Sequence, residues 1–236
     1  MCLNCENPDR RRFLSLTVAG VAAATAGLAL PTGAAFAKTE LTAAEALQKL
    51  KDGNARYMAA PEECAADLMK TRETVAEGQS PWATILGCAD SRVPPELVFG
   101  GLNLGELFVC RKAGNMADTA TMGTIEYGAE HLGSPLVVVL GHERCGAVKA
   151  ACDVAQNGTE LPGNIKPMVD AIVPTAKDLM GKDGDFVDNV VIESARRTAE
   201  KIKAESEIVA ELVKEGKVKV VYARYDLDSG EVTFFE

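Results

Sequence analysis

The sequence has no excess of basic residues. Its 25 lysines and arginines are outnumbered by 34 aspartates and glutamates, which gives a net charge of −9. A chain of this charge offers no electrostatic attraction for nucleic acid or for an anionic membrane surface. Seven cysteines among 236 residues are too few for a small fold held together by disulfides. We also find no internal repeat, low-complexity tract or phosphate-binding loop. With 47% hydrophobic residues, the composition is that of a globular enzyme or binding protein.

The first 37 residues have the pattern of an export signal. Arg10, Arg11 and Arg12 precede a mildly apolar, alanine-rich stretch, and residues 35–37 place alanines at the two positions that a signal peptidase reads. The order Arg-Arg-x-Phe-Leu resembles the twin-arginine signal, whose machinery exports folded proteins. We therefore predict that residues 1–37 are removed. The mature protein is then expected to be periplasmic or extracellular and not bound to a membrane. An uncleaved membrane anchor is the alternative.

Residues 38–236 predict a single α/β domain. Continuous apolar runs, without alternation, are typical of a parallel sheet that is covered on both faces. Such runs occur at residues 82–87, 104–110, 136–140 and 218–225, and a last edge strand is expected at 231–235. Helical spacing of apolar residues is found at 42–57, 119–132, 146–157, 165–180 and 186–215, the last with a break near Ser206. The prediction is one three-layer domain with a mainly parallel central sheet and helices on both faces.

Two short segments that follow predicted strands carry the candidate chemistry. Cys88 begins the run Cys-Ala-Asp-Ser-Arg-Val-Pro-Pro-Glu, and His142 and Cys145 belong to Gly-His-Glu-Arg-Cys-Gly. The carboxyl ends of parallel strands meet at the crevice where open α/β sheets bind ligands. Two thiolates and one imidazole are the ligands of a catalytic zinc, which makes its water acidic enough to yield hydroxide near neutral pH. We predict one Zn²⁺ per chain at Cys88, His142 and Cys145, although iron or cobalt would also suit these ligands.

Asp90 and Arg92 lie two and four residues beyond Cys88. In an extended segment the three side chains point to one face. The Asp90 carboxylate would either accept the proton of a metal-bound hydroxide or bind the metal itself. Arg92 would keep that carboxylate ionised and oriented.

The other cysteines and the second histidine are predicted to be structural. A disulfide between Cys88 and Cys145 is the alternative to a metal site, because export leads to an oxidising compartment. His131 is expected to pack or cap a helix rather than to shuttle protons. No ligand spacing involves the remaining cysteines of the domain, which are Cys64, Cys110 and Cys152.

The two motifs together resemble those of the β-class carbonic anhydrases. The resemblance continues through residues 105–115, 125–127 and 225–232, and it implies zinc on the three ligands with Asp90 and Arg92 as the catalytic pair. In the family's open-site subclass the CO₂ pocket is lined by residues that correspond here to Gln79, Phe108, Tyr127 and Gly146. Ile85 stands where the bicarbonate-regulated subclass has a tryptophan, which favours the unregulated type.

The activity that this resemblance implies is the reversible hydration of CO₂ to bicarbonate and a proton. It also implies a homodimer or a tetramer. Hydrolysis of CS₂ or COS is an alternative, because related proteins use the same zinc site. A non-catalytic zinc-binding protein of the envelope is a second alternative, although a merely structural zinc needs no pair such as Asp90 and Arg92.

Overall fold

The computed structural model describes residues 38–63 and 68–236. The predicted export signal and Cys64 lie outside the described residues. Within these two ranges, no helix combines the length and the apolar character that crossing a membrane requires.

A five-stranded sheet forms the centre of the domain, in the order β2-β1-β3-β4-β5. The first four strands in this order are parallel to one another, and β5 pairs antiparallel with β4. All residues of β1 and β3 are buried, which explains their continuous apolar sequences and confirms the predicted sheet. The strands are β1 (Ala83–Gly87), β2 (Leu107–Arg111), β3 (Leu136–His142), β4 (Lys219–Tyr225) and β5 (Val232–Phe235).

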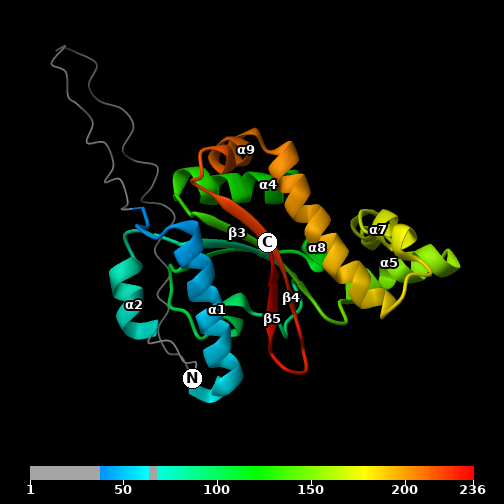
Figure 1. Ribbon diagram of the computed structural model, residues 1–236, viewed down its shortest axis with the longest axis horizontal. Coiled ribbons are helices and arrows are strands. Elements are labelled where there is room, and N and C mark those ends of the chain that lie inside the picture. Colours follow the sequence, from blue (N-terminus) through cyan, green and yellow to red (C-terminus); the bar gives the residue numbers. More distant parts are fainter. Residues whose placement is uncertain (1–37, 64–67) are drawn as a thin grey trace, which may run out of the picture. The chain divides into compact units, whose positions relative to one another are not determined.

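Helices cover both faces of this sheet (Figure 1). They are α1 (Ala43–Ala59), α2 (Leu68–Val75), α3 (Pro95–Val98), α4 (Thr119–Glu126), α5 (Gly146–Asn157), α6 (Ile165–Asp170), α7 (Val173–Leu179), α8 (Phe186–Glu205) and α9 (Glu207–Lys214). Alternate residues of β3 enter two different cores. Leu136 and Val138 pack with residues of α1 and α3, whereas Val137 and Val139 pack with residues of α4, α8 and α9. The predicted three-layer arrangement is therefore confirmed.

Two helix boundaries follow directly from capping side chains. Thr42 accepts a hydrogen bond from the backbone N–H of Glu45, whose carboxylate accepts one from the backbone N–H of Thr42, and this capping box begins α1. Ser206 ends α8 and caps α9 by accepting a hydrogen bond from the N–H of Val209 at 3.1 Å. Both the start at Thr42 and the break near Ser206 are as predicted.

Two helical stretches differ from the prediction in detail. Residues 165–180 form two helices, α6 and α7, because Pro174 has no N–H to continue the hydrogen-bond ladder. Residues 119–132 form α4 followed by a π-helical turn at Tyr127–His131. Such π-turns often occur near functional sites.

A third core lies beside the carboxyl ends of β1 and β3. It contains the side chains of Cys88 and Cys145, packed among apolar residues of α5, α6, α7 and α8 such as Val148, Val169 and Val190. The two motif cysteines are therefore placed together in a buried, apolar part of the domain.

Candidate metal centre

Cys88, His142 and Cys145 meet at the carboxyl ends of β1 and β3. Cys88 follows β1, His142 is the last residue of β3, and Cys145 is the N-cap residue of α5. Because β1 and β3 are parallel neighbours, their carboxyl ends lie side by side. All three residues are buried, and their ligand atoms lie within 4.8 Å of one another. The two sulfur atoms are 3.9 Å apart and both thiols are free, so the disulfide alternative is not what the structure shows.

The imidazole of His142 is oriented for a ligand at Nε2. Its Nδ1 lies 2.9 Å from the carbonyl oxygen of Glu143, so Nδ1 carries the proton and Nε2 keeps its lone pair. Nε2 is completely buried and has no hydrogen-bond partner among the described residues. A buried nitrogen without a partner is costly unless something binds it. This orphaned atom is therefore fitted to a metal ion.

The two thiols share a strongly perturbed protonation equilibrium. A hydrogen bond from the Cys145 thiol lowers the pKa of Cys88, and the backbone N–H groups of Gly114 and Asp90 lower it further. The same pairing raises the pKa of Cys145, because its ionisation would place a second negative charge beside the first. A divalent cation would supply the charge that lets both become thiolates. Two sulfurs and one imidazole form a donor set that fits zinc.

Asp90 and Arg92 form a two-point ion pair at this site, as expected from their spacing. Arg92 donates from Nε to Oδ1 at 2.9 Å and from Nη2 to Oδ2 at 2.8 Å. These bonds hold the pKa of Asp90 well below its usual range, so the carboxylate is ionised. Asp90 Oδ2 lies 3.8 Å from His142 Nε2, which places the negative charge next to the candidate metal position.

Arg111 supports the segment that carries these groups, and sequence reasoning missed it. From the end of β2 its guanidinium donates to the carbonyl oxygen of Cys88 at 3.0 Å and to that of Asp90. A ligand and the adjacent carboxylate are thus fixed through their backbones by one side chain. An arginine at the end of a strand next to the motif strand is a signal that could have found it.

The four predicted pocket residues are not all beside the metal ligands. Gly146 begins α5 directly after Cys145. Gln79 and Tyr127 line a separate cavity of about 440 Å³, and the rings of Phe108 and Tyr127 pack at 6.1 Å. Gln79 precedes β1 and Phe108 pairs with Thr84 near its start, whereas Cys88 follows its end. Within one chain, three of the four residues therefore lie towards the amino ends of these strands, whereas the metal ligands lie at the carboxyl ends.

The residues predicted to be structural are placed accordingly. Cys110 and Cys152 are buried, and burial raises the pKa of each thiol to about 11. They are therefore inert thiols rather than ligands. The ring of His131 packs against that of Tyr127, with centroids 5.1 Å apart.

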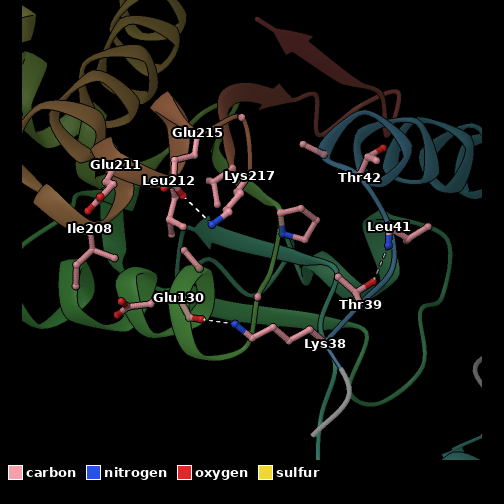
Figure 2. Close-up of a pocket in the computed structure, with 16 residues that line it drawn as sticks. Lys38, Thr39, Leu41, Thr42, Glu130, Ile208, Glu211, Leu212, Glu215 and Lys217 are labelled. Atoms are coloured by element: carbon pink, nitrogen blue, oxygen red, sulfur yellow. Dashed lines mark hydrogen bonds and ion pairs between the residues drawn. The ribbon is translucent and has the colours of Figure 1, made fainter. Parts of the chain in front are cut away.

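A wider cavity, of about 670 Å³, has no part in this chemistry. Figure 2 shows it between the segment that leads into α1, the π-helical turn and the end of α9. Lys38 reaches across it to donate a hydrogen bond to the carbonyl oxygen of Glu130. Its lining includes neither a metal ligand nor the Asp90–Arg92 pair.

Comparison with known proteins agrees with this geometry. A sequence profile described as carbonic anhydrase matches residues 83–232. Carbonic anhydrase 2 of Mycobacterium tuberculosis is 38% identical over 187 residues, which cover 78% of this chain and 89% of that protein. The carbonic anhydrase of Mycolicibacterium smegmatis is 34% identical over 189 residues, covering 79% and 90%. The structure of a Coccomyxa β-carbonic anhydrase in complex with acetazolamide superposes with a TM-score of 0.63 at 28% identity, covering 80% of this chain and 86% of that one. The chain therefore belongs to the β-class carbonic anhydrase family.

Proposed function

We propose that this chain catalyses the reversible hydration of CO₂ to bicarbonate and a proton at a zinc centre. One observation carries the proposal: Cys88, His142 and Cys145 form a buried cluster of potential metal ligands beside an ionised Asp90. A purely structural zinc site has a closed set of four protein ligands and needs no carboxylate held beside it.

Cys88, His142 and Cys145 would hold the zinc ion. Bound there, zinc supplies the Lewis acidity that makes a water molecule nucleophilic near neutral pH. The chain's own contribution is to fix the ligands: the carbonyl of Glu143 sets the tautomer of His142, and backbone N–H groups of Gly114 and Ala147 face the two sulfurs. These outer contacts orient the ligands and favour their ionised forms.

Asp90 orients the attacking water in this proposal. Its carboxylate is ionised and lies 3.8 Å from Nε2 of His142, so it accepts a hydrogen bond from the water and directs an oxygen lone pair towards CO₂. Arg92 occupies both carboxylate oxygens and so keeps Asp90 from binding the metal itself. This pairing, together with Ile85 in place of tryptophan, supports the open, unregulated subclass.

The pocket geometry supports a dimer in which each copy completes the other's site. Gln79, Phe108 and Tyr127 lie towards the amino end of β1, whereas the metal ligands lie at its carboxyl end. The strand β2 forms one edge of the sheet, and Tyr127 beside it is 48% exposed. An exposed strand edge with a large exposed aromatic ring is suited to pairing with a second copy. We propose that these three residues line the CO₂ pocket of the partner copy, with tetramers as a further assembly.

Export by the twin-arginine machinery is part of the proposal and rests on the sequence of residues 1–37. That machinery carries folded proteins, so zinc would be loaded before export. Loading in the reducing cytoplasm would also protect Cys88 and Cys145 from oxidation.

The decisive experiment measures CO₂ hydration, COS and CS₂ consumption and zinc content on one preparation. We expect about one zinc per chain and CO₂ hydration as the main activity, with Asp90→Asn as an inactive, zinc-containing control. Faster turnover of COS or CS₂ than of CO₂ would assign the site to their hydrolysis. Zinc with none of the three activities would leave a metal-binding protein.

A further inference from the structure

The two residues between His142 and Cys145 hold the ligand loop in an unusual backbone conformation. Arg144 has a φ of +53°, in the left-handed region that residues with a side chain seldom adopt. Such a conformation persists only where the surrounding contacts enforce it. Because this loop alone joins a ligand on β3 to a ligand at the start of α5, its conformation sets how the two side chains face one ion.

A two-point ion pair fixes Arg144 from outside the loop. Its Nη2 and Nη1 atoms lie 2.7 and 3.1 Å from the two carboxylate oxygens of Asp228, in the turn between β4 and β5. The neighbouring residue binds the same turn. Glu143 donates its N–H to the carbonyl oxygen of Tyr225 at 2.9 Å, and its carboxylate accepts the N–H of Leu227 at 3.2 Å.

The turn that receives these contacts is itself fixed. The carboxylate of Asp226 accepts the backbone N–H groups of Asp228 and Ser229, at 3.0 and 2.9 Å. On its other side the buried amide of Asn54 in α1 donates to the carbonyl oxygen of Gly230 and accepts the N–H of Val232. Asp228 is therefore carried on a rigid support, from which it can restrain a neighbouring loop.

We propose that Arg144 is a positioning residue, whose ion pair with Asp228 holds the His142–Cys145 loop in the conformation that presents both ligands to the metal. This inference rests on the proposed zinc site. Arg144 touches no ligand atom in the contacts of the described residues and acts only through the backbone of the loop. Its side chain is 52% exposed, and that of Asp228 is 72% exposed. An ion pair so exposed adds little to global stability, so its effect should be confined to the metal centre.

The test measures Zn²⁺ affinity by competition with a chromogenic chelator, using the full-length chain and its variants. Arg144→Ala and Asp228→Asn should each bind Zn²⁺ about 2- to 5-fold more weakly than the wild type, which is the range that an exposed ion pair can supply. Nη2 of Arg144 also lies 3.3 Å from the carboxylate of Glu143, so Arg144→Ala removes this contact as well as the one to Asp228. The double variant Arg144→Ala/Asp228→Asn should therefore be no weaker than Arg144→Ala alone, because that change already removes the contact with Asp228. The melting temperature, followed by Trp82 fluorescence, should change by less than about 4 °C. Co²⁺-loaded variants should also have altered visible absorption, since that spectrum reports ligand geometry.

Two further variants separate the ion pair from its alternatives. Arg144→Gly adopts a positive φ without strain but has no side chain, so it should lose affinity as Arg144→Ala does. Arg196→Ala removes another exposed arginine, which is paired with Glu193 on α8, and this variant should bind Zn²⁺ as the wild type does. Wild-type affinity in Arg144→Gly would show that the backbone conformation matters and the ion pair does not. Wild-type affinity in both Arg144→Ala and Asp228→Asn would overturn the proposal while leaving the zinc site intact. A wild-type chain that binds no Zn²⁺ would instead overturn the zinc site, and this inference with it.

Discussion

The sulfur atoms of Cys88 and Cys145 lie 3.9 Å apart, with the free Nε2 of His142 beside them. Two sulfurs bound tetrahedrally to one zinc, each at about 2.3 Å, would be separated by about 3.8 Å. The ligands are therefore arranged for a metal by the protein itself, through β1, β3 and the start of α5. This preformed arrangement allows the roles of individual residues to be tested separately.

Replacement of one sulfur ligand should remove the metal without unfolding the protein. Cys145→Ser should lose most of the zinc found in the wild type, because a hydroxyl is a far weaker ligand than a thiolate. Elemental analysis of the purified protein checks this. Cys152→Ala is the matched control, since Cys152 is buried in α5 but lies outside the ligand set. Equal zinc contents in the two variants would contradict the ligand assignment.

The Asp90–Arg92 pair should affect catalysis and not metal content. Arg92→Ala and Asp90→Asn should each retain zinc, because three protein ligands remain, yet kcat/KM for CO₂ should fall about 100-fold or more. In Arg92→Ala the released carboxylate is free to swing onto the metal and occupy the position of the water. The double variant should be no worse than the poorer single variant, because both changes disable one pair. Near-wild-type activity in either zinc-containing variant would show that the pair is not catalytic.

Much of this fold could be predicted from local sequence patterns. The buried strands β1 and β3 are continuous apolar runs, and the break at Ser206 is marked by a capping residue between two amphipathic stretches. The metal ligands could be predicted because Cys88 directly follows β1, His142 ends β3 and Cys145 lies a few residues beyond it, at the start of α5. These features depend on residues that are close in the sequence.

The parts that could not be predicted depend on residues far apart in the chain. Arg111 reaches back to Cys88 and Asp90 only because β2 lies next to β1, and Arg144 reaches Asp228 only because β4 lies next to β3. Sequence spacing alone gave no reason to pair them. The resemblance named Gln79, Phe108 and Tyr127 as pocket residues. It did not indicate that they lie towards the amino ends of the strands whose carboxyl ends carry the metal ligands.

Acid stability should depend on Glu193 in α8. Its carboxylate accepts hydrogen bonds from Arg196 at 2.7 Å and from Arg197 at 2.8 Å, which lower its pKa from 4.5 to about 2. Between these values the unfolded chain binds a proton that the folded chain does not, so this stabilisation is complete above about pH 4.5 and is lost as the pH falls towards 2. Both arginines are well exposed, and solvent screening reduces the contribution to about 1 kcal/mol.

Glu193→Gln should therefore unfold at lower urea concentration than the wild type at pH 7, and the difference should shrink towards zero as the pH approaches 2. Fluorescence of Trp82, the single tryptophan and a buried one, follows the unfolding. Glu205→Gln, on the same helix with an exposed pair to Lys201, is the control and should change stability by only a few tenths of a kcal/mol. A difference that stays constant with pH would exclude the ionised pair as its cause.

Export should depend on the paired arginines of the predicted export signal, residues 1–37. Replacement of Arg10 and Arg11 by lysine should leave active enzyme in the cytoplasm, because lysine poorly replaces the pair in the twin-arginine pathway. Cell fractionation followed by a CO₂ hydration assay measures the outcome. Arg12→Lys, which leaves the pair unchanged, should be exported normally. Normal export of the double variant would point to the general secretory route or to an uncleaved anchor.

Mixing two inactive chains tests whether the pocket is shared between copies. Asp90→Asn disables the metal side of a site, and Tyr127→Ala disables the pocket side. If Tyr127 serves the partner's site, a mixed dimer contains one site in which the intact Asp90 of one chain meets the intact Tyr127 of the other. It also contains one site with both defects. Mixed dimers should therefore recover up to about half of the wild-type activity, whereas each variant alone stays low.

The recovery must depend on subunit exchange to support this interpretation. The two variants, carrying different affinity tags, should be unfolded together in urea and refolded with Zn²⁺, and the doubly tagged dimer should be isolated by two successive columns. Refolding Asp90→Asn with Cys145→Ser is the matched control, because both changes lie on the metal side. In that mixed dimer each site has one metal-side defect, so no activity should return. If Tyr127 acted within its own chain, the Asp90→Asn and Tyr127→Ala dimer would also stay inactive, since each of its sites would carry one defect. Equal, low activity in the two mixed dimers would therefore place the CO₂ pocket within a single chain.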